Sequence, residues 1–360
     1  LIGQVQENFI IANGKGGNGK GVLNELFLKS IGDYGTKAPN NIILEKIGKG
    51  NNPEICLLED KRFAVMQEPD EEDKNKDIKI NQSTIKELTG GSNLKVKDLF
   101  QGSKDMDKNI YTTLILECNK RPLLSGTIDD SSSRRLIDIM FRSTFTYDKE
   151  LLKQTEEKRK KLKKCKNEEK IIELENECYV YDADIYYKSP EFQEKYKNTL
   201  MQIVLKEYLP NFIENKENLY DFIPNSIKER TNQYLKDSDI WYSWFIENYK
   251  YIEPPKDKNK REYIQIKDIY DKFKYSEFYK NMSKEQKNKL SKNHFTEKIE
   301  NNKFLKKYYK TKYQPKIYNK VSNKYEQTCI RNCILNYKEI NYKEINYKEI
   351  NYKEINYKEI

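Results

Sequence analysis

The chain contains a single histidine, His294, among its 360 residues. A histidine-rich metal centre needs more than one imidazole, and a lone histidine far from the glycine-rich segment argues against histidine-dependent acid–base chemistry. We expect His294 to be a surface or helix-packing residue.

Paired cysteines and long apolar runs are missing as well. The six cysteines are scattered, and none forms the CxxC pair of a structural zinc site, so we expect reduced thiols in an intracellular protein. No apolar run approaches the roughly 20 residues of a membrane-spanning helix, and no signal-peptide pattern opens the chain. We therefore expect a soluble protein with no membrane partner. The chain begins at Leu1, close to its first expected strand, so we also expect further sequence upstream.

Positive charge is what the sequence has in excess. It holds 67 Lys and Arg residues against 57 Asp and Glu residues, a net charge of +10, with 28 Tyr interleaved. Lysines displace counterions from phosphates and aromatic rings stack on bases, so this composition fits a polyanionic partner. An AT-rich genome would produce the same abundance of Lys, Asn, Ile and Tyr, so composition alone does not decide.

Strand-like and helix-like segments alternate over the first 145 or so residues. Their near-continuous hydrophobicity suits strands that are buried on both faces of a parallel sheet, with helices between them. The pattern predicts an α/β core in residues 1–147. The expected strands are 8–12, 62–66, 112–117 and 136–141, and the expected helices include 22–28 and 83–88.

Residues 148–252 read as a charged insertion followed by a small helical lid. Pro190 suits the first turn of one lid helix, and Ser226 with Glu229 has the spacing of a capping box for another. Trp241, Trp244 and Phe245 belong to a third apolar face.

Residues 258–325 suggest two helices followed by a basic pair of strands. Ser283 and Gln286 could cap a helix that runs to about residue 300, and the strand-like pieces are 304–309 and 316–321. This is the plan of a winged-helix DNA-binding domain, although a small helical bundle would give the same pattern. Residues 336–360 are five copies of Asn-Tyr-Lys-Glu-Ile, whose period matches neither helix nor strand, so we expect a loosely ordered tail without activity.

A glycine-rich segment between the first strand and helix matches the G-x-x-x-x-G-K phosphate-binding loop. Backbone N–H groups of such a loop face phosphate oxygens at the positive end of the helix, and Lys20 would bridge the β- and γ-phosphates. The pattern predicts ATP as cofactor, with Mg²⁺ to neutralise the triphosphate. The predicted nucleotide-binding residues are Gly14, Gly16, Gly17, Asn18, Gly19, Lys20 and Gly21.

Position 21 departs from this pattern, because Gly21 replaces the Ser or Thr whose hydroxyl normally holds the magnesium ion. Either a neighbouring carboxylate and waters complete the metal shell, or the loop binds nucleotide with little hydrolysis.

Polar residues at the ends of the later strands are the catalytic candidates. Glu68 could polarise the attacking water and contact the metal, and Asn119 could orient that water. Arg134 or Arg135 could reach a nucleotide held by a neighbouring subunit. Gln67 stands where a second acid is often found, which leaves Asp70 and Glu71 as helpers. Each feature taken alone could equally be an ordinary turn or a solvated edge.

The order of five motifs makes the pattern specific. Together they resemble superfamily 3 helicases, and they are most similar to the helicase part of the helicase-primases of large DNA viruses (poxvirus and giant-virus type) and of phage and plasmid primase-helicases. The motifs are Asn18-Gly19-Lys20, Arg62 with Glu68, Lys86-Glu87-Leu88-Thr89-Gly90-Gly91, Cys118-Asn119 with Pro122, and Arg134-Arg135.

The resemblance implies an AAA+ type three-layer ATPase core that forms a hexameric ring, binds ATP between subunits and draws single-stranded DNA through its centre in the 3′–5′ direction. It also implies a basic hairpin at residues 92–97, in which Lys95 and Lys97 contact DNA. A primase domain or other replication proteins would be partners, and a cytoplasmic viral replication site or the virion would be the location. Primase and collar regions are not in this sequence.

Three functions remain open from the residues. The first is an ATP-dependent DNA helicase. The second is a nucleotide-gated DNA-binding or assembly subunit without turnover, which Gly21 and Gln67 favour. The third is a phosphate-loop ATPase with no DNA role, such as a small-molecule kinase, and the hairpin lysines and the basic C-terminal region argue against it.

Overall fold

The computed structural model describes residues 6–44, 47, 53–68, 79–91, 94–96, 106–108, 110–125, 128–215, 219–319, 322 and 324–340. The chain divides into two compact units. The first unit comprises Leu1–Gly126 and Asp130–Leu235, and the second comprises Thr127–Asp129 and Lys236–Ile360. Within these described ranges, no helix is both long and apolar enough to cross a membrane.

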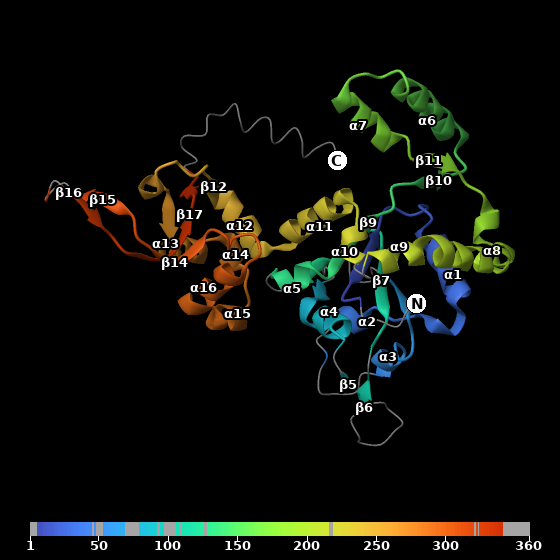
Figure 1. Ribbon diagram of the computed structural model, residues 1–360, viewed down its shortest axis with the longest axis horizontal. Coiled ribbons are helices and arrows are strands. Elements are labelled where there is room, and N and C mark those ends of the chain that lie inside the picture. Colours follow the sequence, from blue (N-terminus) through green and yellow to red (C-terminus); the bar gives the residue numbers. More distant parts are fainter. Residues whose placement is uncertain are drawn as a thin grey trace. The chain divides into compact units, whose positions relative to one another are not determined.

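A parallel sheet forms the centre of the first unit, as Figure 1 shows. Within the described residues it has five strands in the order β2-β3-β7-β1-β9, and all the pairings are parallel. The strands are β1 (Phe9–Asn13), β2 (Gly35–Lys37), β3 (Phe63–Gln67), β7 (Thr113–Cys118) and β9 (Leu136–Met140). The predicted α/β class is confirmed, and each of the four expected strands lies within one residue of its predicted bounds.

Both faces of this sheet are buried, which explains the continuous apolar runs in its strands. Along β3, Phe63 and Val65 point to one face and pack with Ile115 of β7 against α1 (Lys20–Ile31). The alternate residues Ala64 and Met66 are fully buried on the other face.

The helices between residues 149 and 222 belong to the same unit as the sheet. α8 (Pro190–Ile203) begins with Pro190, as predicted, and its Met201 packs into the cluster beneath α1. The first unit therefore runs past the boundary suggested at residue 147 and ends at Leu235.

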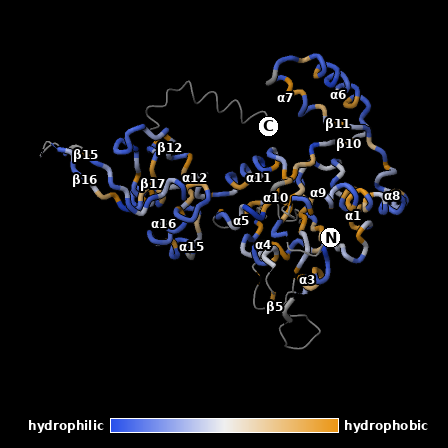
Figure 2. Tube along the Cα trace, in the orientation of Figure 1, coloured by the Kyte–Doolittle hydropathy of each residue, from blue (hydrophilic) through white to orange (hydrophobic). Residues whose placement is uncertain are grey.

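The charged insertion consists of α6 (Lys149–Leu162) and α7 (Glu168–Glu177), and the ribbon of α6 is mostly hydrophilic in Figure 2. It lies between β10 (Thr144–Thr146) and β11 (Val180–Asp182), which pair in parallel. α11 (Asn225–Ser238) begins one residue before Ser226.

The other elements of the first unit connect these strands and helices. α4 follows the predicted helix 83–88 closely, with Asn81 as its N-cap. The elements are η1 (Gly32–Tyr34), α2 (Asn41–Leu44), α3 (Pro53–Cys56), β4 (Lys79–Asn81), α4 (Gln82–Thr89), β5 (Leu94–Val96), β6 (Met106–Lys108), β8 (Leu123–Ser125), α5 (Asp130–Ser133), η2 (Ile185–Lys188), η3 (Val204–Tyr208), α9 (Leu209–Glu214) and α10 (Leu219–Phe222).

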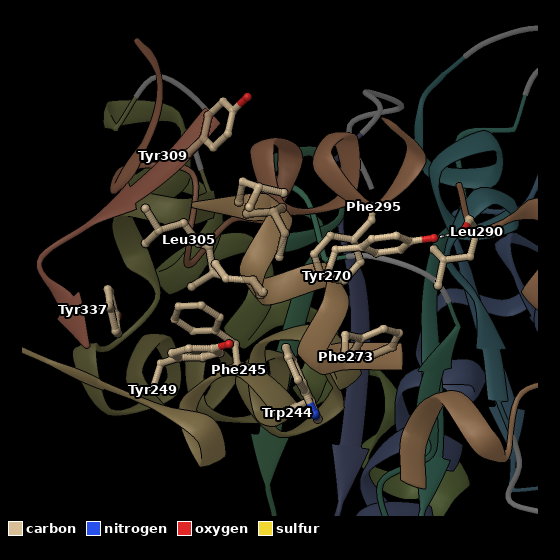
Figure 3. Close-up of a cluster of buried hydrophobic side chains, with 14 residues drawn as sticks. Trp244, Phe245, Tyr249, Tyr270, Phe273, Leu290, Phe295, Leu305, Tyr309 and Tyr337 are labelled. Atoms are coloured by element: carbon tan, nitrogen blue, oxygen red, sulfur yellow. Dashed lines mark hydrogen bonds between the residues drawn. The ribbon is translucent and has the colours of Figure 1, made fainter. Parts of the chain in front are cut away.

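The second unit is built on an aromatic core. Figure 3 shows this core. The Trp244 and Phe273 rings meet edge to face, with their centroids 4.9 Å apart, and Phe245 stacks on Tyr249 with the same distance between centroids. Three of its helices are α12 (Ile240–Asn248), α13 (Ile266–Lys274) and α16 (Lys292–Asn301). An antiparallel sheet has, among the described residues, the order β13-β17-β14, formed by β13 (Tyr263–Gln265), β17 (Ile330–Leu335) and β14 (Tyr309–Tyr313).

Short helices lie between α13 and α16. Ser283 and Gln286 form the predicted capping box, at the start of α15 (Lys284–Lys289). The helix that the sequence extends to about residue 300 is nevertheless interrupted, because Ser291 caps α16 as a new helix. α14 (Glu277–Lys280) also lies between α13 and α16, whereas η4 (Lys258–Lys260) precedes α13.

The predicted pairing of residues 304–309 with 316–321 is wrong. β14 pairs with β17, and β15 (Lys316–Asn319) pairs with β16 (Lys324–Gln327). Residues 302–308 form turns instead of a strand, because the Asn302 side chain accepts hydrogen bonds from the backbone N–H groups of Phe304 at 2.9 Å and Leu305 at 3.1 Å.

The first copy of the pentapeptide repeat is part of the fold. β18 (Tyr337–Glu339) pairs with β12 (Tyr249–Tyr251), and the Tyr337 side chain packs against Phe245 and Tyr308. The expectation of a loosely ordered tail is therefore wrong for residues 336–340, because neighbouring elements supply the apolar contacts that the repeat cannot supply itself. Residues 341–360 lie outside the described residues.

Candidate functional site

Three glycines of the loop between β1 and α1 adopt positive φ. The φ angles are 143° at Gly14, 74° at Gly17 and 86° at Gly19, and side-chain-bearing residues rarely adopt these conformations. A Cβ atom at Gly14 would also lie 2.5 Å from the carbonyl oxygen of Phe141. The chain turns directly from Gly19 into α1, whose positive end therefore lies at the loop. This backbone arrangement suits an anion.

Lys20 is buried at the start of α1, with 7% of its surface exposed. Its ammonium group donates a hydrogen bond to the carbonyl oxygen of Gly14 at 2.6 Å, and its backbone N–H donates to the Asn18 side chain at 3.2 Å. Burial lowers the pKa of Lys20, and the negative charges of Glu117 and Glu68 are among the groups that oppose this shift. The ammonium group is thus held inside the loop where a phosphate would bind.

Two further glycines of the loop, Gly16 and Gly21, have open space around them. A Cβ atom built at Gly16 or at Gly21 would meet nothing within 4 Å, so space does not require glycine at either position. Phe145 lies against the loop, because its N–H donates to the Gly17 carbonyl at 2.8 Å and its ring would lie 3.2 Å from a Cβ atom at Gly19. No motif in the sequence indicated Phe145.

The carboxyl ends of β3, β7 and β1 lie side by side and bring Glu68 and Asn119 together. The Glu68 carboxylate accepts hydrogen bonds from the backbone N–H groups of Asn119 at 2.5 Å and Lys120 at 3.4 Å. This carboxylate is therefore engaged by backbone donors, while Asn119 is exposed. The suggested helpers Asp70 and Glu71 lie outside the described residues.

The two candidate arginines have different surroundings. The Arg134 side chain is 60% exposed and lies 3.0 Å from the Glu7 carboxylate. The Arg135 side chain is 7% exposed, and its guanidinium donates to the Ser131 carbonyl at 2.8 Å and to the Ser131 hydroxyl at 2.7 Å. Arg134 is accessible to another molecule, whereas Arg135 is held within its own chain.

Of the basic hairpin predicted at residues 92–97, the structure describes residues 94–96, which form β5. β5 pairs with β6 in antiparallel fashion, and Lys95 stands opposite Asp107 in this register. Lys97 lies outside the described residues.

A buried cluster of charged side chains lies next to the glycine-rich loop. Asp138 of β9 is fully buried and forms ion pairs with Arg121 at 3.1 Å and Arg230 at 3.0 Å. Asn13, the last residue of β1, donates a hydrogen bond to Asp138 and accepts one from Arg230 at 2.8 Å. Burial raises the pKa of Asp138, and the two guanidinium groups oppose this shift.

This cluster links three parts of the first unit to the loop. Arg121 follows β7, Arg230 belongs to α11, and Asn13 directly precedes Gly14. The backbone N–H of Asp138 also donates to the Thr231 hydroxyl at 3.0 Å. Sequence reasoning missed the cluster, although an Asp within the apolar run 136–141 is a signal that could have revealed it.

The carboxylate of Glu68 beside the glycine-rich loop suits a metal ion that takes few ligands from the protein. Within the ranges that the structure describes, no group of three or more His, Cys, Asp or Glu side chains could hold a metal ion. Mg²⁺ usually binds one or two carboxylates together with phosphates and waters, so Glu68 near the loop fits that mode.

Comparison with known proteins gives viral relatives whose names call them candidate helicases, and no family model matches. A relative from invertebrate iridescent virus 3 is 27% identical over 293 residues, which are 80% of this chain and 28% of that protein. One from invertebrate iridescent virus 6 is 28% identical over 241 residues, 64% of this chain and 24% of that protein. One from Acanthamoeba polyphaga mimivirus is 24% identical over 277 residues, 76% of this chain and 25% of that protein.

The chain thus spans about a quarter of the length of these relatives. Among solved structures, two of the apo C-terminal region of NrS-1 are similar, with TM-scores of 0.29 and 0.31 and identities of 15% and 14%. They cover 68% and 67% of this chain and 61% of each matched chain. Similarity at this level does not identify a shared fold or role. The similarity to helicases of large DNA viruses is confirmed, and superfamily 3 membership stays a prediction.

We predict that Asp138→Ala lowers the free energy of unfolding by about 3–5 kcal/mol, because it leaves two partly buried guanidinium groups without their counter-charge. Asp182→Ala is the control. It removes an exposed ion pair with Lys149, so we expect a change below about 1 kcal/mol. Urea unfolding of the full chain measures both values, and equal effects of the two variants would contradict the structural role of the cluster.

Proposed function

We propose that the chain is the motor part of an ATP-dependent DNA helicase of superfamily 3 type that acts in viral DNA replication. The observation that supports this most is the convergence of Lys20, Glu68 and Asn119 at the carboxyl ends of adjacent parallel strands. The similarity to candidate helicases of large DNA viruses supports it independently.

The chemistry follows from these side chains. Residues 14–21 bind the phosphates of ATP, and Lys20 exchanges its contact with the Gly14 carbonyl for the β- and γ-phosphates. Glu68 would activate the attacking water and would be a ligand for Mg²⁺, because the two backbone N–H groups from which it accepts hydrogen bonds occupy only one lone pair on each carboxylate oxygen. Asn119 orients the same water.

We further propose that the chain assembles as a homo-oligomer. In this assembly six copies form a ring, and ATP binds between subunits. Arg134 is the residue suited to reach a neighbour's nucleotide, because its guanidinium group is exposed and its Glu7 partner is half-exposed. A guanidinium group at that position would stabilise the charge that develops during phosphoryl transfer.

Single-stranded DNA is the proposed partner of the ring. Lys95 in β5 and Lys97 would contact its phosphates from the hairpin that follows the Thr89-Gly90-Gly91 motif. The 3′–5′ direction and a primase or other replication partner are proposals from the family resemblance. The same resemblance suggests a cytoplasmic viral replication site or the virion as the location.

Residues 258–325 are proposed as a winged-helix DNA-binding domain. The order β13-β17-β14, with α13 and α16 between β13 and β14, supports that connectivity, and the β15–β16 hairpin stands where its wing would be. Its central strand, β17, and the end of β16 lie beyond residue 325. Residues 236–340 contain 25 Lys and Arg against 14 Asp and Glu, a net charge of +11 in a chain whose total is +10. The positive charge is therefore concentrated in this region, which favours a polyanion here.

The alternative is a nucleotide-gated DNA-binding or assembly subunit with little hydrolysis. Gly21 and Gln67 favour it because the usual hydroxyl and second acid are missing, and the engagement of Glu68 by backbone N–H groups also favours it. Nucleotide binding without turnover would distinguish this function from the helicase.

We expect the full chain to hydrolyse ATP, and we expect the rate to rise when single-stranded DNA is added. Lys20→Ala should abolish turnover, because the buried ammonium group that would hold the phosphates is removed. Phosphate release with and without DNA measures this. Turnover that is absent in folded protein that still binds ATP would favour the alternative subunit, and turnover indifferent to DNA would favour an ATPase with no DNA role.

We predict that substitution of Arg134 lowers the hydrolysis rate, whereas substitution of Arg135 lowers the stability of the fold. Arg134→Ala should lower the hydrolysis rate about 10³-fold or more, as expected for a guanidinium group that acts across an interface, with unfolding unchanged. Arg135→Ala should mainly lower the free energy of unfolding, because its guanidinium group binds Ser131 within the same chain. Steady-state hydrolysis and urea unfolding of both variants test this, and a normal rate for Arg134→Ala would exclude its proposed role.

A further inference from the structure

We propose that Glu117 provides a carboxylate for the magnesium ion of the bound nucleotide, in place of the hydroxyl missing at Gly21 and the acid missing at Gln67. No motif assigns a role to Glu117. This inference rests on the proposed function, because it needs a nucleotide in the glycine-rich loop.

The register of the sheet puts Glu117 beside the position of the missing acid. Gln67, the last residue of β3, pairs with Glu117 of β7, and Glu117 pairs in turn with Ala12 of β1. Paired residues of parallel strands present their side chains to the same face, so the Glu117 carboxylate lies on the face that an acid at position 67 would use.

That face is the one covered by α1. Along β7, Ile115 points in the same direction as Glu117 and packs with Phe27 and Leu28 of α1. The remaining residues of this stretch, Leu114 and Leu116, are buried on the opposite face. Glu117 is therefore a polar residue at the end of an apolar face, directly where α1 begins.

A hydrogen bond holds Glu117 against the first turns of α1. The buried amide of Asn24 donates to Oε1 of Glu117. Asn24 lies three residues after Gly21 and four after Lys20, so all three share one side of the helix. The charge of Glu117 also acts on Lys20, where it opposes the lowering of the lysine pKa that burial causes.

The space and the donor type both fit a magnesium ion. A side chain at Gly21 would meet nothing within 4 Å, so the place of the usual hydroxyl is open beside this face of α1. Mg²⁺ prefers hard oxygen donors and takes one or two carboxylates with phosphates and waters. Glu117 and Glu68 supply such carboxylates from adjacent strand ends.

The test compares nucleotide affinity with and without Mg²⁺ in the full chain, with a fluorescent ADP as the probe. Glu117→Gln keeps an oxygen that can accept from Asn24 but removes the charge. We expect Mg²⁺ to tighten ADP binding to the wild type, and we expect Glu117→Gln to reduce this gain by about 10- to 100-fold, with affinity in the absence of Mg²⁺ unchanged. Glu25→Gln, which removes a half-exposed carboxylate from α1, should behave as the wild type.

The second part of the test restores a metal ligand by a further substitution. Adding Gln67→Glu or Gly21→Ser to the Glu117→Gln chain should recover part of the Mg²⁺ gain, because each returns an oxygen donor to the same place. An unchanged Mg²⁺ gain in Glu117→Gln overturns the inference and leaves the proposed function intact. If Glu117→Gln loses the same ADP affinity with and without Mg²⁺, or if neither added substitution recovers the Mg²⁺ gain, the inference is overturned. Glu117 would then have a purely structural role. A wild type that binds no ADP would instead refute the proposed function.

Discussion

The position of β7 between β3 and β1 is the constraint on which the candidate site depends. Because these strands are parallel, their carboxyl ends meet at one edge, and residues far apart in the sequence become neighbours there. Glu68 and Asn119 come into contact across this edge, and Lys20 begins the helix above it. A different strand order would keep every motif in the sequence and still separate the chemistry.

The buried charges around Asp138 hold this edge in place. An uncompensated carboxylate in the core would cost several kcal/mol, so its two arginines and Asn13 must stay in position. Since Asn13 immediately precedes the loop, the geometry of the glycine-rich loop and the position of α11 are specified by the same cluster. Arg230 and Asn13 are hydrogen-bonded although 217 residues separate them.

Much of the site was predictable because local patterns specify it. Buried parallel strands give continuous apolar runs, and the glycine-rich loop has a fixed spacing, so Lys20, Glu68 and Asn119 could be named from the sequence. Glu117 and Arg230 could not, because only the strand order and the packing of α11 show their neighbours. The pairing of residues 304–309 was wrong because the Asn302 side chain stabilises turns, and Tyr337 was missed because its burial depends on Phe245 and Tyr308.

In the proposed function, nucleotide hydrolysis at this edge drives movement on DNA. Strand separation of a forked DNA duplex by the full chain tests this, with ATP compared with a non-hydrolysable analogue. We expect separation with ATP, none with the analogue and none for the Lys20→Ala chain. ATP hydrolysis stimulated by single-stranded DNA but without any strand separation would contradict it.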